Sequence, residues 1–242
     1  MKKFFTFLIS LFTGIVFGQD TTFFDMEGNQ IKSLATCHHY EIIERDASDT
    51  NKVVLRAYFK SGQMKSLTNY NPYSKKKLNG KFQEWFENGQ IRKDMEYKDD
   101  NYDGNLLTYW ENGQLKRKDS YKYGKLLEGK CWNAKGKEVK YFDYEVMPVY
   151  AGGEDDLVRY LGKKIYYPQK EKKDGIEGTV YIQFVIDKDG SVTNVRVLKG
   201  VSEGLDEEAA RIVQSLPKWS PGFLDGDPVK VSFVLPIKFR LN

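Results

Sequence analysis

The stretch WFENGQIRK, from Trp85 to Lys93, returns 24 residues later as YWENGQLKR, from Tyr109 to Arg117. Looser copies flank this pair: YFKSGQMK begins at Tyr58 and WNAKGKEVK begins at Trp132. Each copy runs from an aromatic segment into a tight turn that contains glycine, and a second segment follows the turn. A fixed period of this kind indicates a repeat architecture. The sequence therefore predicts consecutive β-hairpins that form one long antiparallel sheet.

Two series of glycines punctuate the hairpins. The turn glycines are Gly62, Gly89, Gly113 and Gly136, and the second series is Gly80, Gly104 and Gly129. The aromatic residues at the repeat spacing are expected to pack the sheet, and they are Tyr58, Trp85, Tyr109 and Trp132. The stretch from Asp99 to Gly104 matches the first half of a calcium-binding loop. Its twelfth position holds Trp110 where a glutamate is needed, so we expect a turn there.

This hairpin pattern resembles the MORN-variant repeats over about residues 53–142. The resemblance implies a scaffold or interaction surface without enzymatic activity. Residues 52–144 carry 20 basic and 12 acidic side chains, a net charge of +8, whereas residues 146–242 carry 14 of each. For an exported protein, an anionic lipid or glycan surface suits this charge better than a nucleic acid.

From Met147 onward the pattern changes to a mixture of helix and strand. Residues 154–161 predict a helix, residues 179–186 alternate as a strand, and the turn DKDG leads into a returning strand at residues 192–199. One apolar helical stripe follows, formed by Leu205, Ala209, Ile212, Val213 and Leu216, with the acids Asp206, Glu207 and Glu208 expected in the first turn. Every second residue from Val229 to Phe239 is apolar, which predicts a long last strand.

These elements predict an α+β carboxy-terminal domain, in which helices pack on a three-stranded antiparallel sheet, next to the all-β antiparallel repeat sheet. Pro236 has no N–H to donate, so the last strand is best suited to a sheet edge. An exposed edge is a template for another chain. It could bind an extended peptide as a further strand or pair with a second copy in a homodimer.

Ordered motifs in this region resemble the TonB carboxy-terminal domain family over about residues 146–241. They are MPVYAGG (147–153), YP (167–168), GIEGTVYIQFVIDKDGSV (175–192), GLDEEAARIV (204–213), PKWSPG (217–222) and VKVSFVLPIKF (229–239). The resemblance implies a domain that pairs the Ton-box segment of an outer-membrane transporter with its last strand. Carried over residue by residue, the docking edge comprises Val231, Ser232, Phe233, Val234 and Leu235, assisted by Tyr167 and Pro168. Trp219 would pack the domain, and a second proline at Phe233 is expected to abolish pairing while the fold survives.

The chain opens with MKKFFTFLISLFTGIVFGQ, in which Lys2 and Lys3 precede an apolar run of 14 residues. As a helix this run spans only ~21 Å, whereas the hydrocarbon layer of a bilayer measures ~30 Å. Small Gly18 fits the cleavage position of a signal peptidase. The pattern therefore favours a signal peptide at residues 1–18, and a retained short anchor is the alternative.

Two cysteines, Cys37 and Cys131, could form one disulfide in an exported chain or could be two buried thiols. The cluster Cys37-His38-His39 has no second ligand pair at zinc spacing, so no metal site is expected. The sequence contains no spaced Ser/His/Asp set and no carboxylate pair in a recognisable site. We therefore expect no enzymatic activity and no cofactor.

The expected organisation is a leader (1–18), an amino-terminal segment (19–52), the repeats (53–142) and the carboxy-terminal domain (146–242). We expect a periplasmic protein that takes part in energy-coupled transport by binding a TonB-dependent transporter of the outer membrane. One alternative is an anchored energy transducer that also contacts an inner-membrane energising complex. Another is an envelope scaffold that holds glycan or lipid surfaces. Since only two prolines lie between Gly18 and Tyr167, a stiff polyproline rod across the periplasm is excluded.

Overall fold

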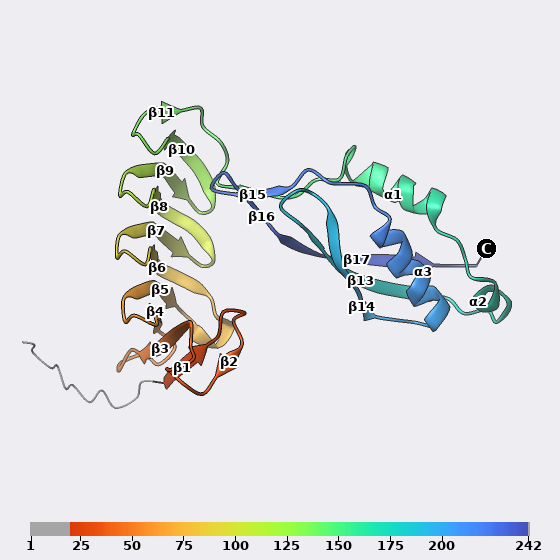
Figure 1. Cartoon of the computed structure of the whole chain (residues 1–242), viewed down its shortest axis with the longest axis horizontal. Helices are drawn as coiled ribbons and strands as arrows, with labels where there is room; N and C mark the ends of the chain where they lie inside the picture. Colours follow the sequence, from red (N-terminus) through yellow and green to blue (C-terminus); the bar gives the residue numbers. More distant parts are fainter. Residues whose placement is uncertain (1–19, 242) are drawn as a thin grey trace, which may run out of the picture. The chain divides into compact units, whose positions relative to one another are not determined.

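The computed structural model describes residues 20–241, so the predicted leader at residues 1–18 lies outside the described residues. The chain divides into two compact units, and the boundary falls between Tyr141 and Phe142. Figure 1 shows the first unit as a stack of hairpins and the second as a sheet with helices.

One eleven-stranded sheet makes up the first unit, and its strand order is β11-β10-β9-β8-β7-β6-β5-β4-β3-β1-β2. Its strands are β1 (Asp20–Phe24), β2 (Gln30–Ile31), β3 (His39–Arg45), β4 (Val53–Phe59), β5 (Met64–Tyr70), β6 (Leu78–Trp85), β7 (Ile91–Lys98), β8 (Asn101–Tyr109), β9 (Leu115–Lys122), β10 (Lys125–Trp132) and β11 (Glu138–Val139). Neighbouring strands pair antiparallel, which confirms the predicted hairpin sheet. The sheet also takes in β1 to β3, from a segment without the repeat pattern.

The repeated turns fold as their residues predict. Gly89 and Gly113 adopt φ values of 82° and 81°, which a residue with a side chain rarely adopts. Asp99 and Asp100 also have positive φ, 53° and 67°, and join β7 to β8. The acidic stretch is therefore a two-residue hairpin turn, as predicted.

Asparagine side chains tie each turn to the next. The side-chain amide of Asn88 donates to the carbonyl oxygen of Glu111 at 3.2 Å, and that of Asn112 donates to Ala134 at 2.9 Å. Each Oδ1 atom also accepts the backbone N–H two residues later within its own turn. The Glu-Asn-Gly-Gln motif thus closes one hairpin and fastens it to the following hairpin.

The two cysteines are separate buried thiols, so the disulfide alternative is wrong. Cys37 precedes β3 and is 3% exposed, while Cys131 lies on β10 and is 0% exposed. Seven strand spacings of ~4.8 Å separate β3 from β10, or roughly 34 Å. A disulfide requires Cα atoms within about 7 Å of one another.

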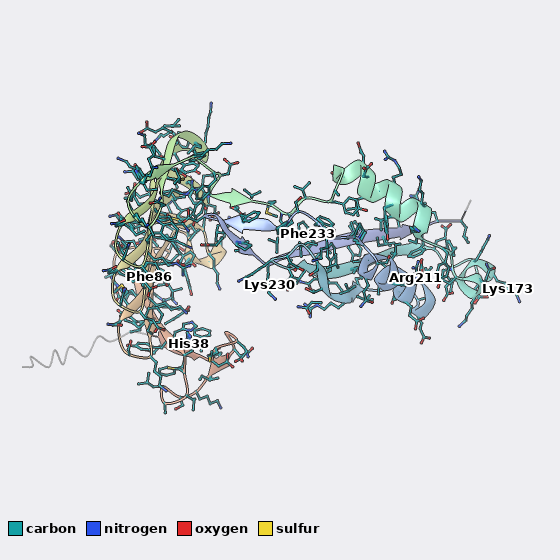
Figure 2. All side chains as sticks on the ribbon, turned by 45° about the horizontal axis from the view of Figure 1, so that its top comes forward. His38, Phe86, Lys173, Arg211, Lys230 and Phe233 are labelled. Atoms are coloured by element: carbon teal, nitrogen blue, oxygen red, sulfur yellow. The ribbon has the colours of Figure 1, made fainter. Side chains whose placement is uncertain are left out.

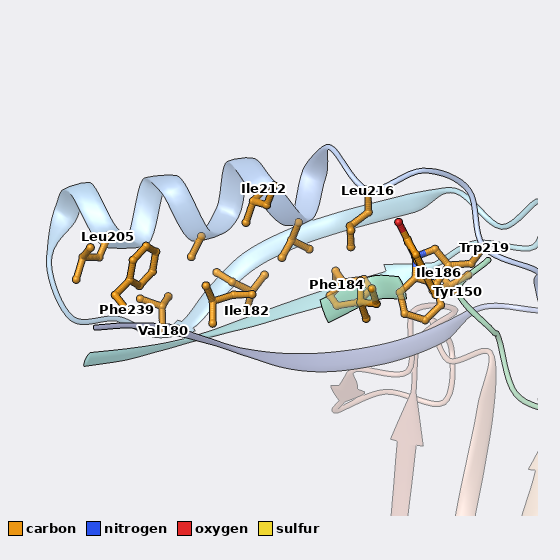
Figure 3. Close-up of a cluster of buried hydrophobic side chains, with 14 residues drawn as sticks. Tyr150, Val180, Ile182, Phe184, Ile186, Leu205, Ile212, Leu216, Trp219 and Phe239 are labelled. Carbon is orange, nitrogen blue, oxygen red and sulfur yellow. The ribbon is translucent and has the colours of Figure 1, made fainter. Parts of the chain in front are cut away.

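The second unit contains a three-stranded antiparallel sheet of order β14-β13-β17. Its strands are β13 (Gly178–Ile186), β14 (Val192–Lys199) and β17 (Val231–Phe239), and its helices are α1 (Gly153–Lys164), α2 (Gln169–Lys173) and α3 (Glu203–Gln214). The apolar faces of α1, α3 and the sheet share one core, which Figure 3 shows beneath α3. The predicted apolar stripe is buried throughout: Leu205, Ala209, Ile212 and Val213 on α3 are 0% exposed, and Leu216, just after the helix, is 7% exposed.

A small second sheet of order β12-β15-β16 completes this unit and was not predicted. It consists of β12 (Glu145–Val146), β15 (Gly222–Leu224) and β16 (Asp227–Val229). Strands of two or three residues carry too few positions to show an alternating pattern. The predicted last strand from Val229 is therefore divided, since β16 ends at Val229 and β17 begins at Val231.

Candidate functional site

The strand β17 lies at one edge of the three-stranded sheet, as Pro236 predicts. Its nine residues pair with β13 from Val231 opposite Ile186 to Phe239 opposite Gly178, without a shift in register. The other edge strand, β14, shows two register shifts against β13, and its Asn194 has a φ of 50°. Bulges make an edge a poor template for a further strand. The regular edge of β17 is therefore the better template.

Pro236 also indicates which backbone groups of β17 point outward. A proline in an unbroken ladder is tolerated where its nitrogen faces away from the neighbouring strand. Residues two apart in a strand direct their N–H and C=O groups to the same side. Ser232 and Val234 therefore present these groups, with Pro236, on the side of β17 away from β13. This side is called the open edge.

The side chains of β17 also alternate between two surfaces. Val231, Phe233 and Leu235 point toward the helices and are partly buried, and Ile237 and Phe239 are 3% and 4% exposed. Ser232, Val234, Pro236 and Lys238 are exposed on the opposite surface of the sheet, called the open face. The five predicted docking residues thus lie together on one strand, but only two of them face solvent with both side chain and backbone.

Phe233 is a core residue as well as an edge residue. Its ring lies 5.8 Å from that of Phe184 and 5.4 Å from that of Trp219. Trp219 is 9% exposed and packs the domain, in agreement with the role that its motif implies. A proline at Phe233 would disturb this cluster and the ladder with β13. The position suited to a proline substitution is Val234, whose side chain is 49% exposed.

The structure does not bring Tyr167 and Pro168 to the predicted docking segment. The Tyr167 ring contacts that of Phe239 edge-on at 5.7 Å, and its hydroxyl donates to the carbonyl oxygen of Ile176. Phe239 ends β17, about 13 Å along the strand from Leu235 at ~3.3 Å per residue. Tyr167 is therefore a packing residue at the far end of the strand, and Pro168 precedes α2.

Two ion pairs fix the β13–β14 turn near the start of β17. Lys230 Nζ lies 2.8 Å from Asp187 Oδ2, and Lys218 Nζ lies 2.6 Å from Asp189 Oδ2. The hydrogen bond from Lys230 lowers the pKa of Asp187, and that from Lys218, with a second from Ser191, lowers the pKa of Asp189. Both carboxylates are thus ionised under physiological conditions. Figure 2 labels Lys230, which immediately precedes β17, and Phe233 on that strand.

One buried acid on α3 was missed as a structural residue. Glu208 is 1% exposed and accepts the backbone N–H of Tyr166 at 2.9 Å. It also accepts Nε and Nη2 of Arg211 at 2.6 and 2.7 Å, and Arg211 donates to the carbonyl oxygen of Lys164. The sequence pattern predicts Glu208 in the first helical turn, which is wrong, because the acids of that turn are Glu203 and Asp206. Glu208 instead joins α3 to the segment that follows α1.

Residues 20–241 contain no group of three or more His, Cys, Asp or Glu side chains placed to hold a metal ion. None of the helices described in this range has the length and apolar character to cross a membrane. The open edge of β17 is accordingly the strongest candidate site.

Comparisons with known proteins find family models that match parts of both units. Residues 163–241 match the family described as Gram-negative bacterial TonB protein C-terminal, and residues 78–99 and 102–123 match the MORN repeat variant. Protein TonB of Vibrio cholerae serotype O1 (strain ATCC 39315 / El Tor Inaba N16961) is 37% identical over 77 residues, which are 31% of this chain and 31% of that relative. The match therefore spans under a third of the relative's length.

Solved structures of the Helicobacter pylori TonB-CTD are also similar. One NMR solution structure is 27% identical at a TM-score of 0.29, covering 36% of this chain and 78% of that chain. A second is 28% identical at a TM-score of 0.29, covering 35% of this chain and 89% of that chain.

Proposed function

We propose that the second unit binds an extended peptide as a fourth strand along the open edge of β17. The peptide is the Ton-box segment of a TonB-dependent transporter of the outer membrane, and the chain takes part in energy-coupled transport from the periplasm. The observation that carries the proposal is the nine-residue ladder between β17 and β13, which is unbroken and leaves one side of β17 open. The match of residues 163–241 to the TonB family supports the identity of the partner.

The contrast between the sheets of the two units supports the choice of edge. The eleven-stranded sheet ends on β2 and β11, which have two residues each. Such short edge strands protect a sheet from further pairing. The edge of β17 is nine residues long, and the exposed, apolar Val234 lies on its open face. Backbone pairing supplies the affinity in this binding mode, and side-chain contacts supply the specificity.

The experiment measures the affinity of the full chain for short Ton-box peptides by isothermal titration calorimetry. Val234→Pro removes the outward N–H of an exposed residue, and Val234→Ala removes only the side chain. We expect Val234→Pro to weaken binding about tenfold or more, since a backbone hydrogen bond is lost and the proline ring obstructs the added strand. Val234→Ala should bind within about threefold of the unaltered protein.

Amide NMR spectra of both variants serve as the control for an intact core. We expect the core signals to be unchanged, because Val234 does not belong to the core. Equal affinities of the two variants would show that the peptide does not pair with the backbone of β17, and would refute the proposed mode.

A further inference from the structure

Five exposed lysines lie within residues 163–173, where α1 leads into α2. They are Lys163, Lys164, Lys170, Lys172 and Lys173, and together they are called the lysine cluster. The ion pairs recorded on α1 and α3 join Arg159 to Asp156 and Arg211 to Glu208, and neither involves the cluster. The positive charge of the cluster is therefore available to a partner outside the chain.

Two buried acids next to this segment turn their charge inward. Glu171, the acid of α2, is 5% exposed and accepts the backbone N–H of Gly204 at 3.1 Å. Glu208 is 1% exposed and accepts two nitrogens of Arg211. The outward charge of residues 163–173 thus comes from lysine alone.

Charges around the cluster do not cancel it. Four exposed acids lie in the adjoining segments, and they are Asp174, Glu177, Glu203 and Glu207. The ring of Tyr167 contacts that of Phe239 at 5.7 Å, which brings the exposed Lys238 and Arg240 to the same end of the unit. With the cluster these make seven cations, which outnumber the four acids.

One exposed aromatic side chain lies within the same segment. Tyr166 is 56% exposed, and the guanidinium group of Arg211 lies 5.3 Å from its ring centre. Its backbone N–H donates to Glu208 at 2.9 Å, which fixes its position beside the lysines. An exposed tyrosine among basic side chains is typical of surfaces that meet a membrane interface. Figure 2 labels Arg211 and Lys173 at this end of the second unit.

Helix stability explains only part of the cluster. Lys163 and Lys164 lie in the last turn of α1, where they complement the helix dipole. The helix α2 has only five residues, and three of them are lysines. Lys170 and Lys173 are three positions apart, so their like charges repel each other and destabilise the helix. A partner of opposite charge would remove this repulsion.

We propose that the lysine cluster and Tyr166 bind the surface of a bilayer that contains anionic phospholipid. Lysine is a compact charge on a flexible stem, which suits an array of mobile phosphate groups. Each basic residue close to an anionic leaflet strengthens binding about fivefold, so the cluster is sufficient for measurable attachment. A second copy of the chain would present the same charges and be repelled. The proposal does not depend on peptide binding at the open edge.

The test places an environment-sensitive fluorophore beside the cluster in the full chain. Gln169 is exposed and both native cysteines are buried, so Gln169→Cys provides one accessible thiol. The labelled protein is titrated with vesicles of phosphatidylcholine and phosphatidylglycerol in equal parts. We expect the fluorescence to shift to shorter wavelength with these vesicles and to stay unchanged with phosphatidylcholine alone. The label reports contact at the cluster itself, independently of the predicted leader.

Two charge variants of the labelled chain locate the contact. The combined substitutions Lys170→Gln, Lys172→Gln and Lys173→Gln should raise the lipid concentration at half-maximal signal about tenfold or more. The matched control loses the same charge at three exposed positions of the first unit, through Lys135→Gln, Lys137→Gln and Lys140→Gln. It should stay within about threefold of the unaltered protein. Circular dichroism checks that both variants are folded.

Several outcomes would overturn the inference. Equal weakening by the two variants would show that overall charge, and not the cluster, binds the vesicles. A signal that is the same with and without phosphatidylglycerol, or no signal with either kind of vesicle, would also exclude it. If the soluble polyanion heparin produces the signal and the vesicles do not, the partner is an anionic polymer and the membrane assignment is wrong.

Discussion

The buried contact between Glu208 and Arg211 provides a quantitative test of how the second unit holds together. Glu208→Ala removes the acceptor for the backbone N–H of Tyr166 and for two nitrogens of Arg211. The Arg211 side chain is 47% exposed, so water can replace its lost partner. The Tyr166 N–H is left without its acceptor, and the carboxylate leaves a small cavity. We expect Glu208→Ala to lower the free energy of unfolding of this unit by about 3 kcal/mol.

Two companion variants sharpen this expectation. Arg211→Ala leaves the buried carboxylate without its cation and should also cost about 3 kcal/mol. The double variant should cost clearly less than the sum, because the two residues act as one unit. Arg159 and Asp156 provide the matched control: they form an ion pair with the same sequence spacing, but their side chains are 61% and 41% exposed. Arg159→Ala should change stability by less than about 0.5 kcal/mol.

The measurement must report on the second unit alone, because the chain has two units that need not unfold together. Native-state hydrogen exchange of the slowest amides in α3 gives that free energy directly. A Glu208→Ala effect no larger than that of Arg159→Ala would refute the view that the buried pair joins α3 to the segment after α1.

Three further predictions concern other parts of the chain. Asn112→Ala should destabilise the repeat sheet by about 1 kcal/mol, because two turn hydrogen bonds are lost. The change in unfolding free energy is measured by chemical denaturation, with hydrogen exchange of amides in β8 and β9 as the signal. Gly190→Ala should lower the denaturant concentration at the unfolding midpoint of the second unit markedly more than Gly175→Ala. Both glycines have positive φ, but only at Gly190 would a Cβ overlap the backbone oxygen of Trp219. Equal midpoints for the two variants would contradict this prediction. Burial lowers the pKa of His39, and the positive charges of Lys65 and His38 lower it further. The unfolded chain therefore binds a proton at His39 more readily than the folded chain, and the stability of the fold decreases as the pH drops through about 6.5. Melting temperatures at pH 7.5 and 5.5 should therefore converge in His39→Gln, and an unchanged difference would exclude His39 as the cause.

The strongest structural predictions came from sequence patterns that repeat. The turn glycines and the alternation in residues 179–186 define hairpins directly, because a period of two fixes which side chains share a face. The edge position of β17 followed from one missing N–H at Pro236. These features depend on residues close together in the sequence, so the sequence alone predicts them.

Other features depend on contacts between distant segments and were not predicted. The small sheet with β12 joins Glu145 to Leu224, and neither segment is long enough to show a pattern. The distance between Tyr167 and the docking segment depends on the packing of the Tyr167 ring against Phe239, at the far end of β17. Glu208 did leave a signal, since it follows Leu205 by three residues and precedes Ile212 by four, which places an acid within the apolar stripe. A charged residue in that position indicates a buried partner.

Hydrogen exchange of individual amides in β17, with and without a Ton-box peptide, tests the central claim most directly. Strand addition predicts slower exchange at Ser232 and Val234, which face the open edge, with little change at Phe233 and Leu235, whose N–H groups already face β13. Protection along β14 instead, or no alternation within β17 under saturating peptide, would contradict the account.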